Sequence, residues 1–339
     1  MSDPTVAAPA PIGLIVNPRS GNDVRRVIAS AGSSTLEDKV SIVRRIAKGA
    51  AAVGATRFVT NHEPHQIVRR ATETMRDVTI ERTPDPLDHT EDDTTRAVAP
   101  MRELGCAVVV VLGGDGTNRA AVKGWPDLAV IPLSTGTNNA FPYWAEPTVA
   151  GSAAGLLATG AVELDANVVR RAKVVRVVMP DEHHEVALID AVAVADRWVG
   201  SLELFDPDTM RVAVLTRADP AAIGFSAVGG LLTPCDAAAD HGLLVRFAPV
   251  DDDPPIVVRA PTAPGHYADV GVTECRVLPL GESVVVEGPV LLAFDGERKR
   301  RLREGERAIL TVHRDGPRVV DLRAVMSAAA DRGLFVKES

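Results

Sequence analysis

The sequence predicts an α/β domain built on a parallel sheet, followed by a β-rich domain. The run from Ala107 to Leu112 contains no polar residue, as expected for a strand that is buried on both faces of a parallel sheet. Before residue 160, strand-like and helix-like segments alternate, which is the order of parallel strands joined by crossovers. After residue 160, short apolar runs follow one another between Pro, Gly and Asp clusters, a pattern typical of a β-sandwich. The first domain is therefore expected to be Rossmann-like.

The length supports this division, because 339 residues exceed what one hydrophobic core normally organises. We expect four segments along the chain. They are a loose tail at 1–10, the α/β domain at 11–150, the β-sandwich domain at 151–320, and a C-terminal helix and tail at 321–339.

Hydrophobic periodicity predicts the elements of the first domain. Short apolar runs predict buried strands at 13–16, 57–59, 78–80, 107–112 and 128–133. Between residues 23 and 52, Val40, Val43 and Ile46 lie at helical spacing, which predicts an amphipathic helix. Further helices are expected at 65–75 and 94–104.

The second domain is predicted from apolar runs that alternate with turn-forming residues. The expected strands are 173–178, 185–190, 212–215, 243–247, 256–259, 283–287, 290–294 and 308–313. A terminal helix is expected at 322–334.

Composition excludes several classes of protein. The formal net charge of −8 argues against a nucleic-acid partner, which needs a basic face to neutralise phosphates. Cys106, Cys235 and Cys275 are too few and too far apart for a disulfide framework or a metal knuckle, which favours a reducing cytoplasm. No signal-peptide pattern or uncharged membrane-length run is present, so we expect a cytoplasmic protein without a membrane partner. His183 and His184 lack further ligands at metal spacing, so no resident metal ligands are expected.

The most informative segment is Gly113-Gly114-Asp115-Gly116-Thr117, directly after the buried run. Glycines allow a sharp turn and a close approach of the backbone to a ligand. Thr117 is expected to cap a following helix, whose free N–H groups favour an anion. A carboxylate beside a bound phosphate is well placed for chemistry. The alternative is a tight βα turn with a solvated aspartate.

Two other loops follow strands of the same predicted sheet. Ser134 to Pro142 contains three hydroxyls and two amides, groups that bind phosphate or ribose without adding charge; its alternative is a hydrophilic helix cap. Asn17 to Gly21 is a turn-rich loop whose Arg19 is as readily explained by solvation. Because carboxyl ends of parallel strands share one edge, we expect all three loops to form one pocket.

Phe294-Asp295-Gly296-Glu297 places two carboxylates around a glycine after an apolar strand. The simpler interpretation is a hairpin with an Asp-Gly turn. The functional interpretation is a pair of acids near a metal-bound phosphate.

These motifs together resemble the superfamily that joins NAD kinases and diacylglycerol kinases. GGDGT at 113–117 resembles the nucleotide-binding signature of both branches, and NPRSG at 17–21, STGTNNAFP at 134–142 and DGE at 295–297 resemble the diacylglycerol-kinase branch. Within it, the chain is most similar to the acetoin-catabolism protein X family, through NPRSGNDVRR, LEDKVSIVRR, the glycine strand and TGTNNAFP with the EPTVAG that follows. The resemblance extends from residue 11 to about residue 325.

The resemblance implies an NAD-kinase-like fold, in which an ATP-binding α/β domain and an acceptor-binding β-sandwich enclose the active site, with ATP and Mg²⁺ as cofactors. Asp115 would be the catalytic acid that activates a hydroxyl or organises Mg²⁺. The implied nucleotide-binding residues are Asn17, Gly113, Gly114, Gly116, Thr117, Thr135, Gly136, Thr137, Asn138 and Asn139. The implied acceptor-binding or acidic-motif residues are Asp190, Asp295 and Glu297.

The chain departs from NAD kinases at two places. Ile189-Asp190 stands where they carry an Asn-Glu or Asn-Asp pair, and residues 218–230 lack most hydroxyls of their TGSTAYSLSAGG segment. The resemblance still makes phosphorylation of a small-molecule hydroxyl the expected activity, with conversion of NAD and ATP to NADP and ADP as the nearest named reaction. Alternatives are a kinase of a small hydroxyketone or polyol in acetoin catabolism and a nucleotide-binding regulator without turnover. By analogy with relatives we also expect a homo-oligomer.

Overall fold

Strands of the N-terminal part form one twisted sheet in the order β3-β2-β1-β4-β5-β18-β6. The computed structural model describes residues 8–20, 34–84, 87–88, 90–135, 139–195 and 206–336. Neighbouring strands from β3 to β18 run parallel, and β6 runs antiparallel to β18. The bounds are β1 Ile12–Val16, β2 Arg57–Thr60, β3 Thr79–Arg82, β4 Val108–Leu112, β5 Ala129–Leu133, β6 Val169–Arg171 and β18 Arg318–Val320. The predicted parallel-sheet class is confirmed.

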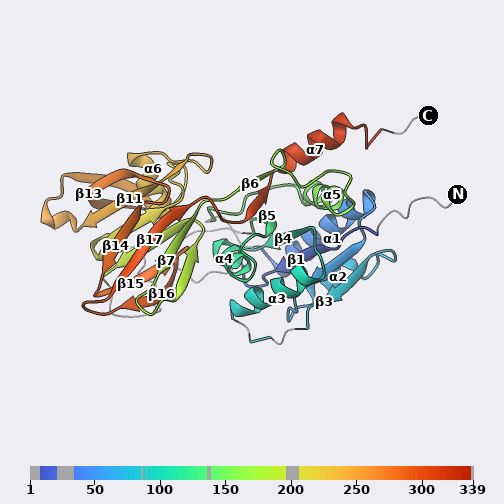
Figure 1. Cartoon of the computed structure of the whole chain (residues 1–339), viewed down its shortest axis with the longest axis horizontal. Helices are drawn as coiled ribbons and strands as arrows, with labels where there is room; N and C mark the ends of the chain where they lie inside the picture. The colour runs from blue at the N-terminus through green and yellow to red at the C-terminus, as the bar shows by residue number, and fades with distance from the viewer. Residues whose placement is uncertain are drawn as a thin grey trace.

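Helices cover both faces of this sheet (Figure 1). One core joins the sheet to α1 (Leu36–Ala52), α2 (Ile67–Thr72), α5 (Pro147–Ala158) and α7 (Leu322–Asp331). The core on the other face includes α3 (Asp92–Glu103) and α4 (Asp115–Gly124). Every residue of β4 is buried, because alternate side chains enter the two cores.

Helix α1 begins at Leu36 because Thr35 closes a capping box. Its hydroxyl accepts from the Asp38 N–H at 3.1 Å, and the Asp38 carboxylate accepts from the Thr35 N–H at 2.9 Å, so each residue satisfies an end group of the other. Residues 23–33 of the expected helix lie outside the described residues, and the described helix begins at Leu36.

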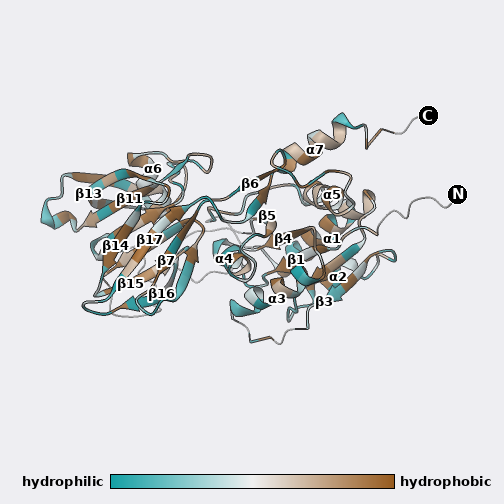
Figure 2. Cartoon of the chain, in the orientation of Figure 1, coloured by the Kyte–Doolittle hydropathy of each residue, from teal (hydrophilic) through white to brown (hydrophobic). Residues whose placement is uncertain are grey.

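The second part is an antiparallel sandwich of two sheets, ordered β12-β13-β11-β10-β9-β15-β16 and β14-β17-β7-β8. Apolar residues from both sheets form the core between them, and Figure 2 shows brown strands on this side of the molecule. Helix α6 (Phe225–Leu232) covers the outer face of the larger sheet. The strands are β7 Val174–Val178, β8 His184–Ala187, β9 Asp190–Val194, β10 Met210–Leu215, β11 His241–Ala248, β12 Ile256–Ala263, β13 His266–Pro279, β14 Ser283–Glu287, β15 Val290–Phe294, β16 Glu297–Leu302 and β17 Arg307–His313.

One predicted strand is wrong in its bounds. The apolar run 185–190 forms two strands, β8 and β9, which belong to different sheets. The chain leaves β8 at Leu188 and Ile189, whose N–H groups donate to the Asp295 carboxylate. The Asp295 side chain therefore accepts the backbone hydrogen bonds that a neighbouring strand would otherwise accept at these two residues.

Sheet membership differs from the expected division into sequence ranges. Helix α5 spans residue 150 and packs along its length on the N-terminal core, and β6 and β18 complete the N-terminal sheet. The chain thus crosses to the sandwich after β6 and returns at β18, so that β1 and α7 both lie in the N-terminal part (Figure 1). Among the described residues, none of the helices has the length and apolar character needed to span a bilayer.

Candidate active site

Three loops meet at the carboxyl edge of the N-terminal sheet, after the adjacent strands β1, β4 and β5. Asn17 Nδ2 donates to Thr117 Oγ1 at 2.8 Å, which joins the first loop to the second. Thr135 Oγ1 donates to Ser20 Oγ at 2.7 Å, which joins the third loop to the first. One edge of the sheet therefore gathers the three loops, and their forming one pocket remains a prediction.

The glycines of the second loop allow close approach by neighbouring groups. A Cβ atom built on Gly113 would lie 2.6 Å from the Thr117 Cβ, and one on Gly114 would lie 2.9 Å from Asn139 Oδ1. One on Gly116 would lie 2.7 Å from a carboxylate oxygen of Glu297. A real Cβ would displace these side chains.

The predicted capping role of Thr117 is wrong. Helix α4 begins two residues earlier, at Asp115, with Gly114 as its N-cap. Gly114 has no side chain to occupy the first N–H groups, so the helix start is suited to an external anion. Thr117 is instead buried in the first turn, where its hydroxyl accepts from Asn17.

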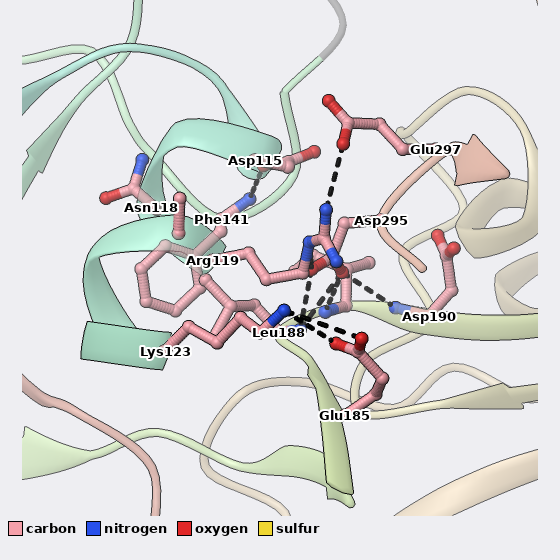
Figure 3. A network of polar contacts seen from close by, with 12 residues as sticks. Asp115, Asn118, Arg119, Lys123, Phe141, Glu185, Leu188, Asp190, Asp295 and Glu297 are labelled. Carbon is pink, nitrogen blue, oxygen red and sulfur yellow. Dashed lines mark hydrogen bonds and ion pairs between the residues drawn. The ribbon is translucent and has the colours of Figure 1, made fainter. Parts of the chain in front are cut away.

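Asp115 does not lie in a freely solvated turn. Its Oδ1 accepts from the N–H groups of Ala140 at 3.1 Å and Phe141 at 2.8 Å, and its Oδ2 accepts from Ala140 at 3.1 Å. Both donors follow β5, so the third loop orients the carboxylate at the start of α4 (Figure 3).

Among the other expected nucleotide-binding residues, Thr135 is buried and Asn139 Nδ2 donates to Ser134 Oγ at 2.9 Å. Gly136, Thr137 and Asn138 lie outside the described residues.

The acidic motif forms the predicted hairpin and also reaches the site. Phe294 pairs with Glu297 across a turn in which Asp295 and Gly296 have φ of 49° and 78°, the positive values that such a turn requires. The Asp295 carboxylate is completely buried. It accepts from the N–H of Leu188 at 2.9 Å and from that of Ile189 at 2.7 Å.

Burial raises the pKa of Asp295 from 3.8 to about 7. The Arg119 charge and the Leu188 N–H oppose this rise, whereas the negative charge of Asp115 adds to it. Asp190, the remaining predicted acid, donates its N–H to Asp295 Oδ1 at 3.3 Å, and its carbonyl accepts from the Asp295 N–H at 3.0 Å. The backbone of Asp190 is therefore adjacent to the motif, and a role of its side chain in the site remains a prediction.

Arg119 connects the two parts of the protein and was missed by sequence reasoning. It is 1% exposed, and its Nη2 lies 2.8 Å from Glu297 and 2.9 Å from Glu91. Its Nε lies 3.7 Å from Asp295 Oδ2. Figure 3 shows the guanidinium between the two acids of the motif. Its position four residues after Asp115, one helical turn away, was the available sequence signal.

Lys39 was also missed. It is completely buried and donates to the carbonyl oxygens of Pro18 and Ser20, both at 2.6 Å. Lys39 shares the apolar face of α1 with Val43 and Ile46, so a charged residue at an apolar helical position was the signal. Arg217, from the segment after β10, donates to the Ala140 carbonyl, and no sequence pattern marked it.

A cavity of about 240 Å³ lies beyond the end of β2, lined in part by Thr60, Asn61, Glu63 and Arg82. Asn61 accepts from the Val16 N–H at 3.4 Å, which places the cavity beside the end of β1. Among the described residues, no group of three or more His, Cys, Asp or Glu side chains forms a metal cluster.

Comparisons with known proteins match both parts of the chain. Residues 12–162 match the ATP-NAD kinase N-terminal domain, and residues 173–315 match the acetoin catabolism protein X C-terminal domain. The chain is 34% identical over 337 residues to acetoin catabolism protein X of Cupriavidus necator, covering 96% of this chain and 93% of that protein. The solved structure of yeast NADH kinase complexed with NADH covers all of this chain and 94% of its own, with a TM-score of 0.52 and 12% identity. This last likeness confirms the predicted fold class.

Proposed function

The chain belongs to the acetoin catabolism protein X family, and from this premise we propose that it transfers a phosphoryl group from ATP to a hydroxyl of a small molecule. The observation that carries the proposal is the position of Asp115. It stands at the start of α4, where three strand ends meet. One helical turn later on the same helix, Arg119 contacts Asp295 and Glu297 of the sandwich, and the charge of Asp115 acts on Asp295. A kinase-type function agrees with the ATP-NAD kinase domain match.

The proposed donor site is the uncapped N-terminus of α4 with the loops around it. Backbone N–H groups there neutralise phosphate charge without a counter-ion that must be desolvated. Asn17, Thr117 and Thr135 supply uncharged polar groups at the same edge. The cavity beyond β2 provides additional space next to the first loop.

Mg²⁺ fits the oxygen-rich side of this site. The Glu297 carboxylate is 42% exposed and lies over Gly116, and Mg²⁺ is typically bound by one or two carboxylates together with substrate phosphates. Glu297 would hold it together with phosphate oxygens of the nucleotide. When bound, the ion would neutralise charge on the transferred phosphoryl group.

Asp115 is proposed to orient the acceptor hydroxyl and take its proton. As the acceptor oxygen bonds to the γ-phosphorus, the bond from that phosphorus to the β–γ bridging oxygen breaks, and ADP leaves with its electron pair. The two N–H donors from Ala140 and Phe141 hold the carboxylate in one orientation, which favours in-line positioning over a freely rotating group.

The acceptor is proposed to be NAD, with a small hydroxyketone or polyol as the second candidate. Helix α6 favours the second candidate, because its residues are mostly apolar and buried. The Ser226 hydroxyl accepts from the Asp219 N–H at 3.1 Å, so it already serves the local turn. Self-association and a cytoplasmic location remain predictions.

The proposal is tested with Asp115→Asn. ADP formation from MgATP is measured with NAD, NADH, acetoin, butanediol and glycerol as acceptors, for the parent and the variant. We expect kcat to fall about 100-fold or more, the usual size of a general-base effect. Asp92→Asn is the matched control, because Asp92 is an exposed acid in the first turn of α3.

Unchanged turnover in Asp115→Asn would refute the catalytic role. Calorimetric binding of ATP by the parent without product from any acceptor would instead favour a nucleotide-binding regulator.

A further inference from the structure

Arg217 reaches from the sandwich to the loop that holds Asp115. It follows β10, and its Nη1 donates to the carbonyl oxygen of Ala140 at 2.9 Å. Its guanidinium carbon also lies 5.7 Å from the centroid of the Phe141 ring, within the range of a cation–π contact. One side chain of the second part therefore holds two consecutive residues of the first.

These contacts act on the peptide group that binds Asp115. The Ala140 carbonyl and the Phe141 N–H belong to one peptide unit, and this N–H donates to Asp115 Oδ1 at 2.8 Å. A hydrogen bond accepted by the carbonyl polarises the peptide and strengthens the bond that its N–H donates. Arg217 thus lies at one end of a line of two hydrogen bonds, with the carboxylate at the other.

The charges around Arg217 agree with this arrangement. Burial lowers the pKa of Arg217, and the negative charges of Asp115, Asp219 and Asp295 oppose that change. A guanidinium stays protonated in proteins, so a half-buried positive charge faces the acids of the site. Loss of this charge removes a hydrogen bond and a favourable field together.

We propose that Arg217 is a positioning residue that holds the Ala140–Phe141 peptide against Asp115 and so fixes the orientation of the carboxylate from the second part of the protein. The effect on catalysis rests on the proposed function of Asp115. The effect on the peptide does not, because it concerns hydrogen bonds of the protein alone. The two therefore require separate measurements.

The experiment compares Arg217→Met with Arg217→Lys and with a control, Arg211→Met. Met keeps an unbranched chain without charge or N–H donors, and Lys keeps the charge. Arg211 is an arginine of β10 that donates to the carbonyls of Asp208 and Met210, away from the peptide at residues 140–141.

The first measurement is hydrogen–deuterium exchange of peptides that cover residues 139–142, without any ligand. We expect exchange to be about 10-fold faster or more in Arg217→Met, intermediate in Arg217→Lys and unchanged in Arg211→Met. A circular dichroism melt establishes that each variant is folded. Unchanged exchange in folded Arg217→Met would overturn the proposal, whether or not the parent consumes ATP.

The second measurement is ADP formation from MgATP with the acceptor that the parent uses best. We expect kcat in Arg217→Met to fall about 10- to 100-fold, with the KM for ATP within about 3-fold, because the change acts on carboxylate orientation rather than on the phosphate loops. Lys at this position is expected to restore part of kcat. Equal loss in both variants, or a change confined to KM, would overturn the positioning role. A parent without turnover refutes the proposed function, and the exchange result alone then supports or overturns the holding of the peptide.

Discussion

Asp295 is expected to make the parent protein less stable as the pH rises, and replacing it with Asn is expected to abolish this pH dependence. Burial raises the pKa of this carboxyl from 3.8 to about 7 in the folded protein. Between these values the unfolded chain has released the proton while the folded protein still binds it. Stability therefore falls with rising pH across this window, because the folded state binds more protons than the unfolded state.

The size of the effect follows from the shift. The difference between about 7 and 3.8 is about 3 pKa units, and each unit corresponds to about 1.4 kcal/mol, which gives about 4 kcal/mol once both states are ionised. Asn cannot ionise, and its Oδ1 can still accept from the Leu188 and Ile189 N–H groups. Its amide N–H₂ would face Arg119, so a pH-independent loss of stability is also expected.

The assay is urea unfolding of the parent and Asp295→Asn at pH 5 and at pH 8. The quantity compared is the difference in unfolding free energy between the two proteins, because titration of groups that do not interact with Asp295 cancels from it. We expect the advantage of the parent to shrink by about 3 kcal/mol from pH 5 to pH 8, because about two of the three pKa units lie within this interval. The exposed Asp92→Asn variant should show no such change. An equal difference at both pH values would refute the reasoning, since it would mean that Arg119 and the backbone N–H groups keep the carboxylate ionised throughout.

Two further substitutions separate support of the loops from chemistry. In Lys39→Met the carbonyl oxygens of Pro18 and Ser20 lose their buried donor, so we expect the protein to be destabilised by about 2–4 kcal/mol. Thermal unfolding checks this, with Lys48→Met as the control because Lys48 is exposed on the same helix. Equal melting temperatures of Lys39→Met and the parent would contradict the expectation. In Gly116→Ala the new Cβ would lie 2.7 Å from the Glu297 carboxylate. Because this flexible side chain can move away, the unfolding free energy should change by less than about 1 kcal/mol, whereas ADP formation should fall about 10-fold or more. Full activity would argue against a role for Glu297.

The local pattern of apolar residues was sufficient to predict most strands of the N-terminal sheet. Buried parallel strands are continuous apolar runs, and β4 is buried throughout. It was insufficient where pairing is distant. Strand β18 has only three residues, and the whole sandwich lies between it and its partner β5 in the sequence. No residue near Val319 therefore indicates which strand it pairs with. Strand β13 mixes buried and exposed positions along its length, and α6 is too apolar to show an amphipathic period.

The candidate site divides in the same way. Glycines, hydroxyls and acids in short motifs predicted the three loops and the hairpin, since those residue types are required by the backbone geometry itself. Arg119 and Arg217 act across the boundary between the two parts, and their partners are Glu297 and Ala140. Arginine is usually a surface residue, so only the packed structure shows that Arg119 is buried and Arg217 half-buried between the two parts.

The two arginines connect the parts in opposite directions. Arg119 extends from the N-terminal part to the acids of the sandwich, and Arg217 extends from the sandwich to the loop after β5. Asp115 interacts with both ends of this arrangement, through the Phe141 N–H and through its charge effect on Asp295. A rotation of one part against the other would disturb both connections, yet leave the loops after β1 and β4 intact. The proposed nucleotide binding would therefore depend on the N-terminal part, whereas the proposed orientation of the carboxylate would depend on the two parts being docked.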